Sequence, residues 1–118
     1  MMSLRYMLSQ NKSIESLKLG NNKLKDKSCE YIYEGLKDNS RLTQLHLEGN
    51  SFGNEGARFI AMLLLSTKTE LTHLYLDNNL VEDEGAEFLA TSLRANKVLQ
   101  YLYLNNNRIN YKGLYKLG

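Results

Sequence analysis

The chain has 118 residues, of which 42% are hydrophobic and 24% charged, and its formal net charge is +2. This composition is typical of one globular domain, and the near balance of charges argues against a nucleic-acid partner or an acidic membrane surface. No run of about 18 apolar residues is present, so the sequence predicts no membrane-spanning helix and no membrane partner.

The single cysteine and the N-terminal segment indicate the cellular compartment in which the protein is expected. Cys29 is the only cysteine, so neither an intrachain disulfide nor a cysteine cluster for zinc can form. Residues 1–13 lack the apolar core and the small-residue cleavage site of a signal peptide. We therefore predict a reducing, cytoplasmic setting. The chain has no proline and no linker-like stretch, which predicts a single domain over residues 1–118.

Four segments repeat one pattern, in which leucines alternate with other residues and an asparagine follows. The pattern is L-x-x-L-x-L-x-x-N-x-Φ, where Φ is apolar and isoleucine takes the first place in one copy. In chain order the copies are IESLKLGNNKL (14–24), LTQLHLEGNSF (42–52), LTHLYLDNNLV (71–81) and LQYLYLNNNRI (99–109). The alternation predicts short parallel strands near 16–18, 44–46, 73–75 and 101–103.

Between these segments, apolar residues recur at helical spacing. They predict helices near 27–38, 55–66 and 84–95, with a further helix near 3–10 and a stub after 111. Each unit is therefore a strand, a turn and a helix. Repetition at a step of 28 or 29 residues predicts a solenoid.

The repeated pattern resembles leucine-rich repeats, specifically the ribonuclease-inhibitor-like class with its alternating 28–29-residue unit, over essentially the whole chain. The resemblance implies an α/β leucine-rich-repeat solenoid: a right-handed arc with parallel strands on the concave face and helices on the convex face. It implies about four repeats, with partial repeats at both ends. Proteins of this class recognise other proteins with an extended curved surface, so a protein partner is expected.

The resemblance also gives the repeated asparagine a structural role. In the family this side chain turns inward and bonds to backbone groups of its own and adjacent turns, which suits an amide that both donates and accepts. The implied ladder consists of Asn22, Asn50, Asn79 and Asn107.

The residues between the leucines should point out from the concave face, because strand side chains alternate between faces. Toward the C-terminal end these positions collect tyrosines and histidines, with Glu48 and Asp77 along one edge. Tyrosine supplies rigid contact area with a polar tip. The alternative is that strand propensity alone places tyrosine there. The candidate partner-binding residues are His46, His73, Tyr75, Asp77, Tyr101, Tyr103 and Asn105.

Catalytic and metal-binding motifs are missing from the sequence. It has no Gly-rich phosphate loop, no GxSxG, no HExxH and no paired Cys/His spacing. We therefore predict a non-catalytic protein without a cofactor or a metal. Acidic residues near the helix starts are assigned to capping and to the helix dipole, and Cys29 to the core.

The two ends of the chain suggest a second hypothesis. Both ends fall inside the helix of an incomplete repeat, and no following repeat covers the last leucines. An apolar end with an unpaired strand edge at 101–103 is a template for association. The chain is therefore expected either to be a segment of a longer repeat protein or to self-associate through its C-terminal end.

Overall fold

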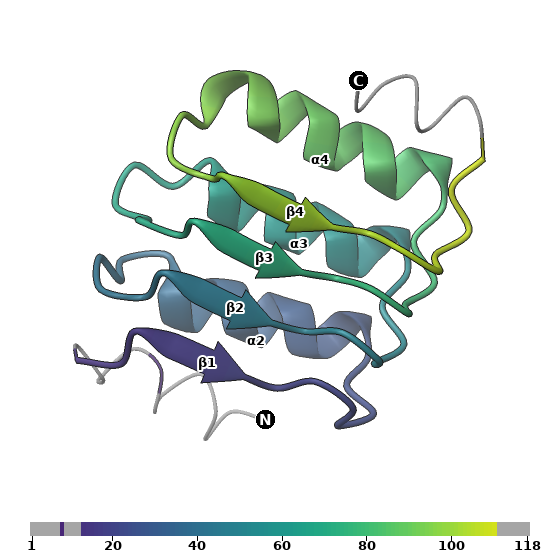
Figure 1. Ribbon diagram of the computed structural model, residues 1–118, viewed down its shortest axis with the longest axis horizontal. Coiled ribbons are helices and arrows are strands. Elements are labelled where there is room, and N and C mark those ends of the chain that lie inside the picture. Colours follow the sequence, from purple (N-terminus) through teal and green to yellow (C-terminus); the bar gives the residue numbers. More distant parts are fainter. Residues whose placement is uncertain (1–7, 9–12, 111–118) are drawn as a thin grey trace.

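The computed structural model describes residue 8 and residues 13–110. Within them the elements alternate along the chain and form one parallel sheet in the order β1-β2-β3-β4. The helices cover one face of this sheet and leave the other face open (Figure 1). The predicted α/β repeat solenoid is thus confirmed. The elements are β1 (Ser16–Lys18), α2 (Asp26–Leu36), β2 (Gln44–His46), α3 (Asn54–Leu64), β3 (His73–Tyr75), α4 (Asp83–Ala95) and β4 (Tyr101–Tyr103).

The strand positions predicted from the leucine pattern match the structure residue for residue. The pairing register aligns Leu17, Leu45, Leu74 and Leu102, one from each repeat. Because a register slip of one residue would turn the leucines outward, this alignment keeps every repeat leucine on the helix side of the sheet.

The predicted helices differ from the observed ones at their ends. Helices α2 and α3 begin one residue before the predicted 27–38 and 55–66 and end two residues sooner, while α4 begins one residue early and ends at the predicted position. After α2 the side chain of Asn39 accepts hydrogen bonds from the amides of Arg41 and Leu42, both at 2.8 Å. This turn directs the chain back toward the sheet, which ends the helix early. The predicted helix near 3–10, apart from Leu8, and the stub after 111 lie outside the described residues.

The core fills the layer between the sheet and the helices. The core consists mainly of leucine and isoleucine side chains, and burying one of them stabilises the fold by roughly 1.5–3 kcal/mol relative to leaving it exposed. The central repeats contribute most of the fully buried side chains, including Leu45, Ile60, Leu64, Leu74 and Leu89.

Asn79 shows how the repeated asparagines join adjacent repeats. Its Oδ1 accepts a hydrogen bond from the amide of Phe52 at 3.1 Å. Its Nδ2 donates to the carbonyls of Leu47, Leu76 and Asp77 at 3.1, 3.0 and 3.2 Å. One buried side chain therefore satisfies backbone groups of its own turn and of the preceding one.

Asn50 and Asn107 bond to the backbone in the same manner. Asn50 Oδ1 accepts from the amides of Asn22 and Leu24, and Asn107 Oδ1 accepts from the amide of Val81. Asn22 differs, because it is exposed and its Nδ2 donates within its own turn, to Gly20. No turn preceding that of Asn22 is among the described residues.

A second set of side chains caps the helices from the preceding repeat. Asp26, at the start of α2, accepts hydrogen bonds at Oδ1 from the amides of Gly53 and Gly56, at 2.7 and 2.9 Å. These amides belong to the N-cap and first turn of α3, whose own N-cap residue makes no side-chain cap. Asn54 does the same for Glu82 and Gly85 at the start of α4. The starts of α3 and α4 are thus tied to the repeat before each of them.

The turn glycines of this register lie close to the preceding repeat. A β-carbon at position 85 would meet Asn54 Oδ1 and Val81 Cγ1, each at 2.8 Å. The equivalent atom at position 56 would meet Asp26 Oδ1 at 2.7 Å. The absence of a side chain at both positions therefore lets the capping residue approach the helix start.

Candidate functional site

Aromatic rings on the open face of the sheet stack on one another across the strands. The rings of His46 and Tyr75 lie with centroids 4.1 Å apart and planes at 8°. Tyr75 and Tyr103 follow at 4.7 Å and 3°. A second column joins His73 to Tyr101 at 4.5 Å and 25°. We call these five side chains the ring stack.

The two columns also lie side by side. Tyr101 and Tyr103, two residues apart on β4, have ring centroids 6.5 Å apart and planes at 8°. His73 and Tyr75 make the equivalent pair on β3 at 6.3 Å. Because both faces of the Tyr75 ring are covered by neighbouring rings, Tyr75 can offer a partner only its ring edge and its hydroxyl group.

The parallel register produces this arrangement. Side chains in the same column of adjacent strands lie about 4.8 Å apart, which is close to the spacing of stacked rings. Pairs of aromatic rings stabilise by roughly 0.5–1.5 kcal/mol beyond their buried area. Tyr101 remains 48% exposed, whereas the other rings are partly buried. The stack is therefore both ordered by its own contacts and accessible.

Hydrogen bonds fix the histidines at the N-terminal side of the stack. His73 Nδ1 lies 2.9 Å from Thr72 Oγ1, and His46 Nε2 lies 3.3 Å from Gln44 Oε1. His46 Nδ1 is 4.0 Å from Glu48 Oε2.

The remaining predicted residues lie where the strands end. Asp77 follows β3, and its Oδ1 accepts a hydrogen bond from the amide of Asn105 at 2.7 Å. Asn105 itself is exposed. The structure thus gathers all the predicted partner-binding residues on one face of the sheet or at its adjoining edge.

The sequence reasoning missed one feature of this edge. Asn106 has a φ of 60°, and the equivalent positions Asn21, Gly49 and Asn78 also have positive φ. Asparagine and glycine tolerate this left-handed conformation best, so the restriction of the column to these two residue types was the available signal. In the run at 105–107 the first asparagine lies at the sheet edge, the second makes the turn and the third bonds to the backbone.

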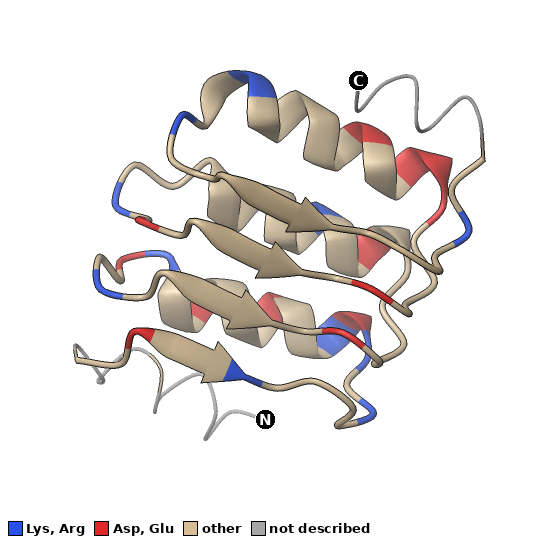
Figure 2. Ribbon diagram, viewed as in Figure 1, with Lys and Arg blue, Asp and Glu red and all other residues tan. Residues whose placement is uncertain are grey.

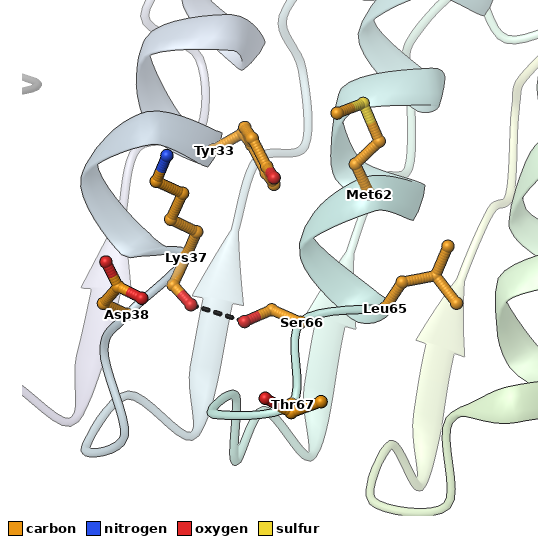
Figure 3. Close-up of a pocket in the computed structure, with 7 residues that line it drawn as sticks. All are labelled: Tyr33, Lys37, Asp38, Met62, Leu65, Ser66 and Thr67. Atoms are coloured by element: carbon orange, nitrogen blue, oxygen red, sulfur yellow. Dashed lines mark hydrogen bonds between the residues drawn. The ribbon is translucent and has the colours of Figure 1, made fainter.

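A pocket on the helix side is the other candidate. It has a volume of about 460 Å³ and lies between the C-terminal ends of α2 and α3 (Figure 3). Ser66 donates a hydrogen bond across it to the carbonyl of Lys37. Its charged groups are paired with close neighbours, since Lys37 bonds Glu34 and Asp38 lies 3.7 Å from Lys68. The pocket therefore presents no convergent set of free polar groups.

Other kinds of site find little support in the part of the chain that the structure describes. No group of three or more His, Cys, Asp or Glu side chains there could hold a metal ion. Among the described helices, none has the length and apolar character needed to cross a membrane. Cys29 is fully buried, and desolvation, helped by the nearby charge of Asp26, raises the pKa of its thiol.

Comparison with known proteins agrees with this architecture. A family model described as "Leucine Rich repeat" matches residues 10–32, 38–61, 67–90 and 95–118. The chain therefore belongs to the leucine-rich repeat family. The family model does not distinguish the ribonuclease-inhibitor-like class from other leucine-rich repeats, so membership of that class stays a prediction.

Two individual proteins are similar to this chain. Protein TORNADO 1 of Arabidopsis thaliana is 44% identical over 52 residues, which span 44% of this chain but only 4% of that protein. The solved structure of leiomodin-1 actin-binding site 2 has a TM-score of 0.85 at 18% sequence identity, and the match covers 98% of this chain and 68% of that one. The structural likeness shows the shared fold.

Proposed function

We propose that this protein is a non-catalytic module that binds another protein on the open face of its sheet. The observation that carries the proposal is the ring stack, an ordered and partly exposed aromatic surface extending over β2, β3 and β4. Rings that are already held in place lose little conformational freedom when a partner docks, which favours affinity. Tyrosine is also enriched among the residues that dominate binding energy.

The comparisons support a protein partner without naming it. Repeat solenoids present extended binding surfaces, and the leiomodin-1 segment carries actin binding in its name. A parallel sheet is normally covered on both faces, and here the helices cover only one (Figure 1). The open face is therefore the surface available to the partner.

The test compares the wild-type protein with a variant in which Tyr75, Tyr101 and Tyr103 are alanine. Proteins captured from a native extract are identified, purified and titrated against both forms by calorimetry. We expect a partner that binds the wild type and loses at least about tenfold in affinity for the variant, or about 1.4 kcal/mol. A validated partner with equal affinity for both forms would place the binding surface on the helices or the loops instead.

An alternative proposal is assembly through β4. Among the described residues β4 pairs only with β3, and Leu102 and Leu104 are partly exposed where Leu74 and Leu76 are buried. A further repeat or a second copy of the chain would cover this edge. Light scattering over a concentration series, with Leu104→Lys as the comparison, tests whether a second copy of the chain binds at β4. A concentration-independent monomer would refute it.

We also propose that residues 1–118 form one domain and that the protein is cytoplasmic. The core of the described residues is continuous from the first repeat to the last. Cys29 is a buried free thiol, as expected in a reducing compartment. Imaging of the tagged protein in its native cell tests the location, and a single cooperative unfolding transition tests the domain.

A further inference from the structure

Two carboxylates lie beside the ring stack, and we call them the acidic pair. Glu48 follows β2 and Asp77 follows β3, each two residues after a ring of the first column. Strands β2 to β4 and the turns directly after them, residues 44–50, 73–79 and 101–107, contain no Lys or Arg. Figure 2 shows the acidic segments after β2 and β3 and the lack of basic colour on these three strands.

The imidazole of His46 lies beside one member of the acidic pair, with its Nδ1 4.0 Å from Glu48 Oε2. Neither Glu48 nor Asp77 forms an ion pair with a Lys or Arg among the described residues. Asp77 Oδ1 accepts a hydrogen bond from the amide of Asn105, which orients the carboxylate. No described residue donates a hydrogen bond to its second oxygen. Glu48 Oε1 is buried and has no hydrogen-bond partner in this part of the chain, whereas the Glu48 side chain as a whole is 35% exposed and can be reached by a partner. A carboxylate oxygen without a donor is costly, so it favours a ligand that brings one.

The backbone leaves room for Glu48 to take this position. A β-carbon at position 20 would lie 2.9 Å from Glu48 Cδ. Gly20 is the residue of the first repeat equivalent to Glu48 and Asp77. The carboxylate of Glu48 therefore packs over the neighbouring repeat, beside the ring of His46.

We propose that the partner segment bound by the ring stack is basic and that an arginine from it donates hydrogen bonds to the acidic pair. This inference rests on the function proposed above. Arginine has an apolar stem that can pack against the ring edges and a planar group whose several donors match carboxylates. Lysine would supply a positive charge for the carboxylates but lacks the planar set of donors.

Other segments fit the same surface less well. An acidic segment would be repelled by the two carboxylates, because no described lysine or arginine forms an ion pair with either of them. The basic residue on the neighbouring strand is Lys18 of β1, which is aligned with His46. A neutral apolar segment would cover the acidic pair without supplying donors, and a desolvated charge without a partner is unfavourable. A basic segment with arginine can both pack against the rings and donate hydrogen bonds to the carboxylates.

The experiment uses three short glycine–serine peptides that carry arginine, lysine or citrulline at the same positions. Citrulline keeps the shape of arginine without its charge. Each peptide is titrated into the full chain and followed by amide NMR. We expect the arginine peptide to shift amides of β2 to β4, to bind at least about tenfold tighter than the citrulline peptide, and to weaken with added salt.

The matched variants are Glu48→Gln with Asp77→Asn, and Glu70→Gln with Glu84→Gln. Both double variants change the net charge equally, but Glu70 and Glu84 are exposed residues outside the strands that carry the ring stack and the turns directly after them. We expect only the first to lose the preference for arginine over citrulline. Equal binding of the two peptides by the wild type, or equal losses in both double variants, would overturn the inference.

The two proposals can fail separately. A validated partner that requires the tyrosines but binds the Glu48→Gln, Asp77→Asn variant as tightly as the wild type would overturn the basic segment alone. A partner that does not require the tyrosines would overturn the binding face itself.

Discussion

At the scale of single residues, Asn79 is the side chain whose replacement should reveal how the repeats are joined. It is buried, and its amide satisfies four backbone groups in two turns. Asn79→Ala leaves the buried amide of Phe52 without its acceptor and takes one donor from each of three carbonyls. We therefore expect a loss of about 1–3 kcal/mol in the free energy of unfolding. Urea denaturation measures it. Asn105→Ala, an exposed asparagine two residues from the ladder position of the next repeat, should change stability by less than about 0.5 kcal/mol. Similar values for both variants would contradict the role of Asn79.

Cys29 is the residue for which burial has a chemical consequence. Desolvation raises the pKa of its thiol, and the thiolate is the reactive form. We expect a thiol-specific disulfide reagent at pH near 8 to label the native protein far more slowly than the protein in urea. The pKa is raised in the folded state only, so the unfolded chain loses this proton first. The contribution of Cys29 to stability is therefore complete below the ordinary thiol pKa of about 8.5 and declines above it. Equal labelling rates with and without urea would show that the thiol is accessible.

At the scale of elements, the start of α3 depends on a residue of another repeat. Asp26→Ala removes the acceptor of the Gly53 and Gly56 amides, and loss of a cap costs about 0.5–2 kcal/mol. Hydrogen exchange should become faster in the first turn of α3. Asp26→Asn is the matched control, because Asn54 makes the equivalent cap with an amide oxygen. If the alanine and asparagine variants exchange alike, the cap contributes nothing to α3.

Comparison of the elements with their predicted positions shows which features of the structure can be predicted from the sequence. The strands follow from leucine alternation, a local pattern with a fixed period, and they were predicted to the residue. The caps were predicted only as acidic residues near helix starts, because a sequence does not reveal that Asp26 reaches the helix of the next repeat. The residues between the leucines were predicted to point out from the concave face, and the strand register then sets His46 and His73 in different columns of that face. The stacking of the rings depends on side-chain orientation and could not be predicted.

At the scale of the whole molecule, each described repeat is stabilised by contacts with its immediate neighbours. Each strand pairs with the adjacent ones, and the helices contact one another in chain order. Stability in such a chain is approximately a sum of repeat terms and interface terms. A core side chain of a central repeat should therefore contribute more to the free energy of unfolding than its equivalent in a repeat with one described neighbour.

The leucines Leu74 and Leu102 test this dependence on position. They occupy the same place in adjacent repeats and pair in the sheet, but Leu74 is fully buried and Leu102 only partly. Leu74→Ala should cost about 2–5 kcal/mol, because it removes contacts and leaves a cavity between two interfaces. Leu102→Ala should cost distinctly less, because part of its surface already meets solvent. Both values come from denaturant unfolding, with Gln100→Ala at an exposed position beside β4 as a control expected within about 0.5 kcal/mol of the wild type. Equal losses at the two leucines would mean that the last described repeat is covered as completely as the central one, and would favour assembly through β4.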